Sequence, residues 1–463
     1  MKLSTADDKL GLLGLRSAMM TGELSATTVV DACLSHIQTE NPGLGAYLHV
    51  CEERARRAAA TVDAVRQQQP QLLGELAGAP LSIKDLLDTS YAPTTYGNGH
   101  FRNNVPTTTA TVIERLEREH AIVLGKTNLH EFAFGVTNEN PHFGPARNPR
   151  DPERITGGSS GGSAASVAAG LAVASIGTDT GGSVRIPASL TGVVGYKPSF
   201  GLVPTTGVYP LAPSLDHVGP LTTSVFDAAL LTDIMAAIGG HRLSRSVARA
   251  KSAPGSSIRA GIPNSLIQTY ARADVALWFI DLIGKMSHDG VIRNSANVEL
   301  DGEVIARHQG NIISAEAYAV HADQLDSNPD VYGKDIRERL SAGRLISAKD
   351  YIGSKAFQTS FASQLETWFE RVDCILMPTT PITAPRIGTA EIVFPSGPVP
   401  VRQLLTRFTN PWNLSGLPAI TLPAGTIEGM PIGLQIIGPR DGDEHLLRVA
   451  AWIESYLPYR VGD

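Results

Sequence analysis

Two clusters of glycine and serine, at residues 156–163 and 177–183, constrain the fold of this chain more than any other feature. An alanine-rich, helix-forming segment and a short apolar stretch run between them. Glycine allows backbone conformations and close approaches that a Cβ atom would block, so dense glycine predicts tightly packed turns. A flexible linker is not usually followed directly by a helix and a strand. The pattern therefore favours ordered, tightly packed turns over a flexible linker.

Short apolar segments alternate with helical ones along the chain. Residues 1–65 have apolar side chains near helical spacing, with Ser25 as a candidate N-cap, and residues 444–457 form a closing helix. Apolar runs too short for helices predict strands at 79–84, 121–125, 171–176, 374–377, 419–422 and 433–437. Strands separated by helices predict an α/β fold with a mixed or mostly parallel sheet.

Composition describes an ordinary globular protein. The 463 residues carry 39 basic and 45 acidic side chains, a net charge of −6, which excludes a basic nucleic-acid coat. No run of about 18 apolar residues occurs, and Asp7 and Asp8 stand where a signal peptide needs apolar residues, so we expect a cytoplasmic protein. Cys33, Cys51 and Cys374 are widely spaced, without a CxxC pair, and are expected to be reduced.

The segment between Asp233 and Asp274 has no acidic residue but six basic ones: Arg242, Arg245, Arg249, Lys251, Arg259 and Arg272. Either an anionic partner binds it or it is a solvated connector, and its serine, alanine, proline and glycine favour the connector. We therefore expect a single domain made of N-terminal helices (about 1–65), a core (66–240), this basic connector (241–258) and a C-terminal half (259–463).

The first glycine cluster suggests several chemistries. It lacks the Gly-Lys-Ser/Thr of a phosphate loop and the GxGxxG spacing of a dinucleotide site. Residues 157–161 match G-x-S-x-G, which would make Ser159 the nucleophile of an α/β-hydrolase esterase. That interpretation needs a strand just before the cluster, whereas residues 147–154 form a proline-containing loop. Histidines such as His217, His288 and His445 stand in no recognisable catalytic context.

The second cluster places Ser183 directly after Gly181 and Gly182. Glycine at these positions lets backbone amides converge, as an oxyanion hole for a tetrahedral intermediate requires. Ser183 is therefore a candidate nucleophile that needs a base. No histidine lies in either cluster or between them.

Residues 157–198, which read GGSSGGSAASVAAGLAVASIGTDTGGSVRIPASLTGVVGYKP, resemble the signature segment of the amidase signature family. The similarity extends to segments 79–85, 125–132, 214–220, 413–418 and 433–435. It implies an amidase-signature fold, with a large central mixed β-sheet flanked by α-helices on both faces. It also implies an enzyme without a cofactor.

The resemblance implies a Ser–cis-Ser–Lys triad. Ser183 would be the nucleophile, Ser159 the bridging serine that follows a cis peptide bond, and Lys84 the base, made neutral by desolvation. The backbone amides of Thr180, Gly181, Gly182 and Ser183 would form the oxyanion hole. Asp179 and Arg185 would hold that loop. His130-Glu131-Phe132-Ala133-Phe134 lacks the second histidine of a zincin motif, so no metal is expected.

The implied activity is hydrolysis of the C–N bond of small or aryl amides through an acyl-enzyme, with anilides, carbamates (urethanes) and esters as further candidate substrates. The alternative is an amidotransferase A-type subunit that releases ammonia within a complex. Leu86 departs from the Lys-Asp-Asn usual in that branch. We therefore expect a small-molecule amide or carbamate substrate, no nucleic acid, no membrane, and a monomer or homodimer.

The resemblance assigns the substrate pocket less sharply than the catalytic residues. Pocket walls are expected from 91–98, 132–138, 204–213 and 312–351. Residues 205–210 combine a glycine with a proline, which makes the 204–213 loop a candidate lid but does not decide whether it is one.

Overall fold

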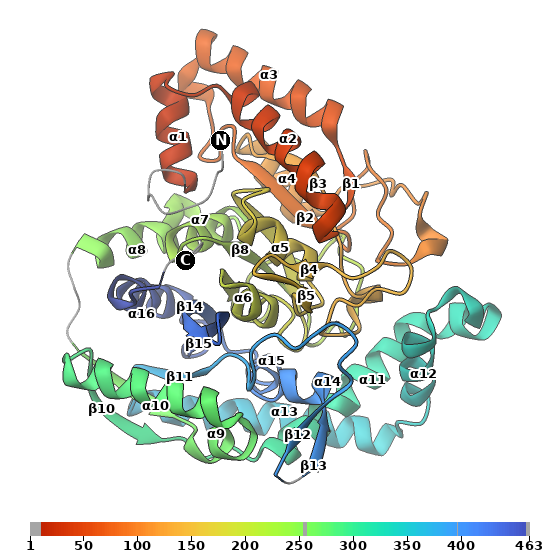
Figure 1. Ribbon diagram of the computed structural model, residues 1–463, viewed down its shortest axis with the longest axis vertical. Coiled ribbons are helices and arrows are strands. Elements are labelled where there is room, and N and C mark those ends of the chain that lie inside the picture. The colour runs from red at the N-terminus through yellow and green to blue at the C-terminus, as the bar shows by residue number, and fades with distance from the viewer. Residues whose placement is uncertain (1–10, 253–256, 396, 460–463) are drawn as a thin grey trace.

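The computed structural model describes residues 11–252, 257–395 and 397–459, and its central element is a mixed eleven-stranded sheet (Figure 1). The strand order is β1-β3-β2-β6-β8-β7-β14-β15-β11-β9-β10. The strands are β1 (Tyr47–Val50), β2 (Pro80–Lys84), β3 (Ile122–Thr127), β6 (Ala174–Asp179), β7 (Val194–Lys197), β8 (His217–Thr222), β9 (Ile258–Ile262), β10 (Ile292–Asn297), β11 (Cys374–Pro378), β14 (Ala419–Ile427) and β15 (Met430–Ile437). Two small hairpins stand apart: β4 (Arg147–Asn148) with β5 (Asp151–Ile155), and β12 (Glu391–Phe394) with β13 (Gly397–Pro400).

The sheet joins the two halves of the chain. Strand β2 pairs in parallel with β3 and β6, and β9 pairs in parallel with β10 and β11. The two halves meet at an antiparallel seam, where Lys197 of β7 lies opposite Ala419 of β14. Strands β8 and β7 lie between β6 and this seam, yet Asn413 from the C-terminal half donates a hydrogen bond to Asp179 at the end of β6.

Helices flank the sheet, as predicted. Helix α2 begins after Ser25, whose side chain accepts a hydrogen bond from the Thr28 amide, so the predicted N-cap is confirmed. The helices are α1 (Leu12–Thr21), α2 (Ala26–Leu44), α3 (Glu52–Gln68), α4 (Thr111–Arg118), α5 (Gly161–Ala168), α6 (Arg185–Thr191), α7 (Val225–Met235), α8 (Arg242–Ser252), α9 (Asn264–Tyr270), α10 (Ala273–His288), α11 (Gly302–Ser327), α12 (Lys334–Gly343), α13 (Ala348–Glu366), α14 (Val401–Thr406), α15 (Asn410–Leu414) and α16 (Asp443–Tyr456).

Helices α5 and α6 begin directly at the two glycine-serine clusters and position the site. Every residue of α6 is buried, and so are seven of the eight residues of α5. Gly162 explains the close packing: a Cβ there would lie 2.5 Å from both the Ala46 carbonyl oxygen and the Asn128 nitrogen. The glycine clusters therefore let a helix approach neighbouring backbone, as the sequence predicted.

Two sequence expectations differ from the structure. The strand expected at 171–176 is β6, which begins at Ala174, because a turn with Gly170 at φ +68° follows α5. Most of the expected basic connector is helix α8, which packs against α7 and α16 because Leu243 and Val247 on one face are buried. Residues 253–256 of that segment and 1–10 of the N-terminal segment lie outside the described residues, and the division into regions stays a prediction.

No helix within the described ranges is long and apolar enough to cross a membrane. Cys33, Cys51 and Cys374 are buried as free thiols. Burial raises the pKa of all three thiols, to about 12 at Cys33 and about 11 at Cys51, which keeps them protonated and unreactive.

Candidate active site

Lys84, the last residue of β2, forms buried hydrogen bonds with the side chains of Ser159 and Thr178. Its Nζ is 2.7 Å from Ser159 Oγ and 2.7 Å from Thr178 Oγ1. Lys84 and Ser159 are completely buried. The parallel pairing of β2 with β6 brings the lysine beside Thr178.

Burial controls the charge of Lys84. Desolvation lowers the pKa of Lys84 from its ordinary value to about 7, against the opposing charges of Asp179 and Asp216. A substantial fraction of the amine is therefore neutral at neutral pH and carries a free lone pair. Both neighbouring groups are hydroxyls, which donate a hydrogen bond to a neutral amine as readily as they accept one from an ammonium.

The two serines lie on neighbouring turns. The Gly158–Ser159 peptide bond is cis, as the resemblance implied. The Ser160 amide donates to the Ser183 carbonyl oxygen at 3.2 Å, and this bond joins the first turn to the second. Ser183 is 5% exposed, and its Oγ has no hydrogen-bond partner among the described residues. A pocket opens directly on this hydroxyl.

The turn before Ser183 orients several backbone amides. The Gly182 amide donates to Asp179 Oδ1 at 2.8 Å, and the Val184 amide donates to Asp179 Oδ2 at 3.1 Å. The expectation that Gly182 contributes a free amide to an oxyanion hole therefore needs correction, because the Asp179 carboxylate already accepts that N–H. Within the described chain, the amides of Thr180, Gly181 and Ser183 have no such acceptor.

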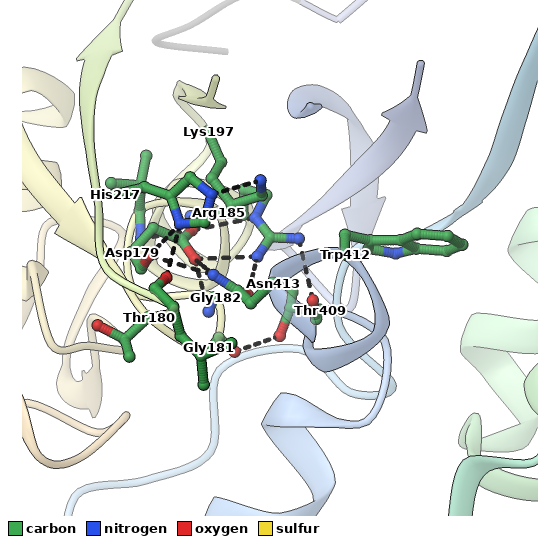
Figure 2. A network of polar contacts seen from close by, with 12 residues as sticks. Asp179, Thr180, Gly181, Gly182, Arg185, Lys197, His217, Thr409, Trp412 and Asn413 are labelled. Atoms are coloured by element: carbon green, nitrogen blue, oxygen red, sulfur yellow. Dashed lines mark hydrogen bonds and ion pairs between the residues drawn. The ribbon is translucent and has the colours of Figure 1, made fainter. Parts of the chain in front are cut away.

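A buried ion pair holds this turn (Figure 2). Arg185 donates from Nε to Asp179 Oδ2 at 3.0 Å and from Nη2 to Asp179 Oδ1 at 2.9 Å, and both residues are fully buried. Burial alone would raise the pKa of Asp179, but the charges of Arg185 and Lys197 and the hydrogen bond from Asn413 outweigh it and hold the pKa well below its usual range. The carboxylate stays ionised and bonded to the loop, which agrees with the expected supporting role of this pair.

Residues from the C-terminal half complete the support, and sequence reasoning did not single them out. Asn413 Nδ2 donates to Asp179 Oδ1 at 2.8 Å, and Gln435 Oε1 accepts from Arg185 at 2.6 Å. Thr409 Oγ1 donates to the Gly181 carbonyl oxygen at 2.6 Å (Figure 2). Asn413 and Gln435 lie in segments that carried the family resemblance, which was the one available signal for them.

A second buried lysine lies behind the ion pair. Lys197 Nζ donates to the Leu417 carbonyl oxygen at 2.6 Å and lies 3.2 Å from His217 Nε2. Burial and the charge of Arg185 lower the pKa of Lys197 to about 7, and burial with the charge of Lys197 lowers the pKa of His217 well below its usual value. In Figure 2, Lys197 and His217 lie on the opposite side of Asp179 from Gly181, and they support the loop from that side.

The pocket at Ser183 has a volume of about 410 Å³. Phe134, Val136, Leu211 and Ile313 give it an apolar wall, and Thr180, Gly181 and Ser183 lie along its catalytic side. Polar side chains come from α11 and from the segment around α14 and α15, namely Glu303, Arg307, Gln309, Arg402, Gln403, Arg407 and Asn410. The expected walls at 132–138, 204–213 and 312–351 each contribute, but 91–98 does not, and residues 303–310 and 402–410 were missed.

The 204–213 loop is bonded to the segment after Lys84. Tyr209 N donates to the Leu86 carbonyl oxygen at 3.0 Å, and Asp88 N donates to the Gly207 carbonyl oxygen at 2.8 Å. The Tyr209 ring packs 4.4 Å from the Tyr96 ring, centroid to centroid. That this loop acts as a lid stays a prediction.

The His130-Glu131-Phe132 motif has a structural role. Glu131 is buried and accepts hydrogen bonds from Asn98 Nδ2 at 2.6 Å and from the Gly333 amide at 3.1 Å. Over the described ranges, no three His, Cys, Asp or Glu side chains gather as a metal site would require. The absence of a metal from the function stays a prediction.

Gly182→Ala should damage the site without unfolding the protein. Gly182 has φ +121°, and an added Cβ would lie 2.3 Å from Thr409 Oγ1. Relief of this contact requires the turn before Ser183 to move. We expect a loss of kcat on the order of 10²-fold, as for one misplaced oxyanion donor.

The matched control is Gly284→Ala, in an exposed part of α10 with no atom within 4 Å of the added Cβ. It should keep full activity and gain up to about 1 kcal/mol of unfolding free energy. Equal activity in the two variants would show that the Gly182 conformation is not required.

Comparison with known proteins supports the fold and the family. The Amidase family model matches residues 28–447. A solved amidase structure is 34% identical with a TM-score of 0.88 and covers 96% of this chain and 100% of that chain. The A-type subunit of glutamyl-tRNA(Gln) amidotransferase from Symbiobacterium thermophilum is 34% identical over 94% of both chains. The solved A-type subunit of the enzyme from Thermotoga maritima is 31% identical with a TM-score of 0.79 and covers 98% of this chain and 96% of that chain.

These relatives correct one expectation. The net charge of −6 was the main reason to expect a protein with no nucleic-acid partner. That prediction is wrong, because curated relatives that match nearly the whole chain are subunits of an amidotransferase named for tRNA. Net charge reports the whole surface and does not describe what a local surface or a partner subunit binds. The family itself is clear: the chain belongs to the amidase signature family.

Proposed function

We propose that this protein hydrolyses the C–N bond of an amide through an acyl-enzyme on Ser183. The observation that carries the proposal is the buried contact of 2.7 Å between Lys84 Nζ and Ser159 Oγ, next to a pocket that exposes Ser183. A lysine with a pKa of about 7 is poised to take and return a proton at neutral pH.

In the first step the neutral Lys84 accepts a proton from Ser159, which accepts the proton of Ser183 as its Oγ attacks the carbonyl carbon. In the described part of the free protein, Ser183 Oγ has no hydrogen-bond partner, and catalytic hydrogen bonds often form only when substrate is bound. The negative oxygen of the tetrahedral intermediate binds the free amides of Thr180, Gly181 and Ser183.

In the second step the proton returns by the same route. Ser159 donates it to the leaving nitrogen as the C–N bond breaks, and the amine departs while the acyl group stays on Ser183. Water then attacks the ester and gives up a proton to the Ser159–Lys84 pair. The pair then returns that proton to Ser183 Oγ as the bond to the acyl carbon breaks, so the carboxylic acid leaves and the free Ser183 hydroxyl is restored.

Two substrate classes fit this chemistry. The relatives favour a primary amide whose ammonia is used by an amidotransferase complex, since near-full-length matches carry that name. The apolar wall of Phe134, Val136, Leu211 and Ile313 favours small acyl or aryl amides, with carbamates as a further class.

Covalent labelling tests the acyl-enzyme. A fluorophosphonate should modify Ser183, identified by mass spectrometry of the digested protein. Lys84→Ala should lower both the labelling rate and amide turnover by at least about 10²-fold, the low end of a general-base contribution. Label on Ser159 would support the esterase alternative, whereas full activity in Lys84→Ala would remove Lys84 from the mechanism.

The pH profile tests the charge state of the base. Only neutral Lys84 accepts a proton, so kcat/KM should rise with pH and level off above a midpoint near the pKa of about 7. Because the pKa of Lys197 is also lowered to about 7, Lys197→Met is the control. The midpoint should persist in that variant; its disappearance would assign the titration to Lys197.

A substrate comparison separates the two classes. Ammonia release from glutamine and 4-nitroaniline release from 4-nitroacetanilide are measured on the same preparation. If the apolar wall decides, kcat/KM for the anilide should exceed that for glutamine at least tenfold. Rapid glutamine hydrolysis with little anilide turnover would instead support an ammonia-releasing subunit.

A further inference from the structure

Two side-chain carbonyl oxygens in the active-site pocket have no hydrogen-bond donor. They are Oε1 of Gln309 and Oδ1 of Asn410, and both atoms are buried without a partner in the described part of the chain. Gln309 as a whole is fully buried. Buried carbonyls are nearly always hydrogen-bonded in folded proteins, because leaving one unpaired is costly. Two such atoms in one pocket indicate an N–H or O–H donor supplied by a ligand.

The orientation of Gln309 is fixed by its other amide atom. Its Nε2 donates to the Thr180 carbonyl oxygen at 3.3 Å, so the nitrogen end of the amide is turned to the loop before Ser183. A 180° turn of the amide would place two carbonyl oxygens against each other. Oε1 is therefore held as an acceptor, and helix α11 supplies a rigid base for it.

Asn410, which comes from the C-terminal half of the chain, lies against the same loop. A Cβ built on Gly181 would be 3.1 Å from Asn410 Oδ1 and 3.6 Å from Gln309 Nε2. Both amide groups therefore border the residue that contributes a free oxyanion-hole amide. Asn410 begins α15, the helix that also carries Asn413 of the buried network.

The carboxylate that lines this pocket is already engaged. Glu303 pairs with Arg407 at 2.9 Å and accepts a hydrogen bond from the Tyr270 hydroxyl at 2.7 Å. Arg307 and Arg402 carry only donors. The wall beside Gly181 thus combines oxyanion donors with two acceptors, a pattern complementary to an amide group, which presents one C=O and one N–H.

The geometry points to Gln309 and Asn410 as the acceptor site for the N–H of the scissile amide. This inference rests on the proposed function and names its substrate class: amides, anilides and carbamates that keep an N–H on the leaving nitrogen. The hydrogen bond turns that N–H away from Ser159. It thereby directs the nitrogen lone pair toward the serine that delivers the proton. The N–H bond itself is not broken, and the proton gained by the leaving amine comes from Ser183 through Ser159 and Lys84.

A matched pair of substrates tests this role. 4-Nitroacetanilide and 4-nitrophenyl acetate share the acetyl group and the aryl ring, but only the anilide has an N–H. Gln309→Leu should lower kcat/KM for the anilide at least 10-fold more than for the ester, the discrimination expected when a buried polar partner is removed. Damage to the loop through the lost bond to Thr180 would lower both substrates equally.

Two further variants separate acceptor chemistry from packing. Asn410→Leu should lower the ratio of anilide to ester turnover, whereas Asn410→Asp, which keeps an oxygen at the same place, should preserve most of it. Gln364→Leu is the matched control, because Gln364 is exposed on α13 and is not among the residues that line the pocket. It should leave the ratio as in the wild type.

The outcomes are distinct. An unchanged ratio in both Gln309→Leu and Asn410→Leu, with amide hydrolysis intact in the wild type, would overturn the acceptor site alone. A wild-type protein that hydrolyses neither substrate and is not labelled on Ser183 would overturn the proposed function, and the acceptor site with it.

Discussion

The site depends on burying one lysine without placing a carboxylate against its amine. Among the described residues, the Lys84 amine hydrogen-bonds to the hydroxyls of Ser159 and Thr178 and to no carboxylate, and burial brings its pKa to about 7. Asp179, in the adjacent turn, opposes this shift. The Arg185 guanidinium binds both oxygens of that carboxylate, so its positive charge offsets the field that Asp179 exerts on Lys84. The same ion pair therefore shapes the loop before Ser183 and protects the neutral state of the base.

Buried polar contacts also connect the two halves of the chain, which share one sheet. Each half supplies groups that the other leaves unsatisfied: Arg185 comes from the N-terminal half, while Asn413 and Gln435 come from the C-terminal half. Arg185 alone donates to oxygens of Asp179, Asn413, Gln435 and the Thr409 backbone. Removing an acceptor from such a network leaves a buried charge uncompensated, which costs far more than a surface contact. The seam between β7 and β14 brings these residues together.

The sequence predicted those parts of the structure that have a local pattern. The strand ending at Lys84 was expected at 79–84 and is observed at 80–84, because its apolar residues are contiguous. Lys84 and Ser159 were expected to meet and are 2.7 Å apart. Gln309 gave no signal, since one polar residue in a long helix usually faces solvent. The hydrogen bond from the Gly182 amide to Asp179 also could not be predicted from a local sequence pattern, because it depends on the geometry of the turn.

The groups proposed for catalysis and the polar wall of the pocket therefore come from different parts of the chain. The proposed catalytic groups lie on β2, on the turns before α5 and α6, and on β6, all within residues 80–191. The polar pocket wall comes from α11 and from the segment around α14 and α15, at 303–310 and 402–410. A change in the second set could alter which amide binds while the first set stays in place. A solved amidase and the A-type subunit of a tRNA amidotransferase each match this chain at 34% identity. What this chain accepts is decided by side chains such as Gln309 and Asn410, at a distance in sequence from every signature residue.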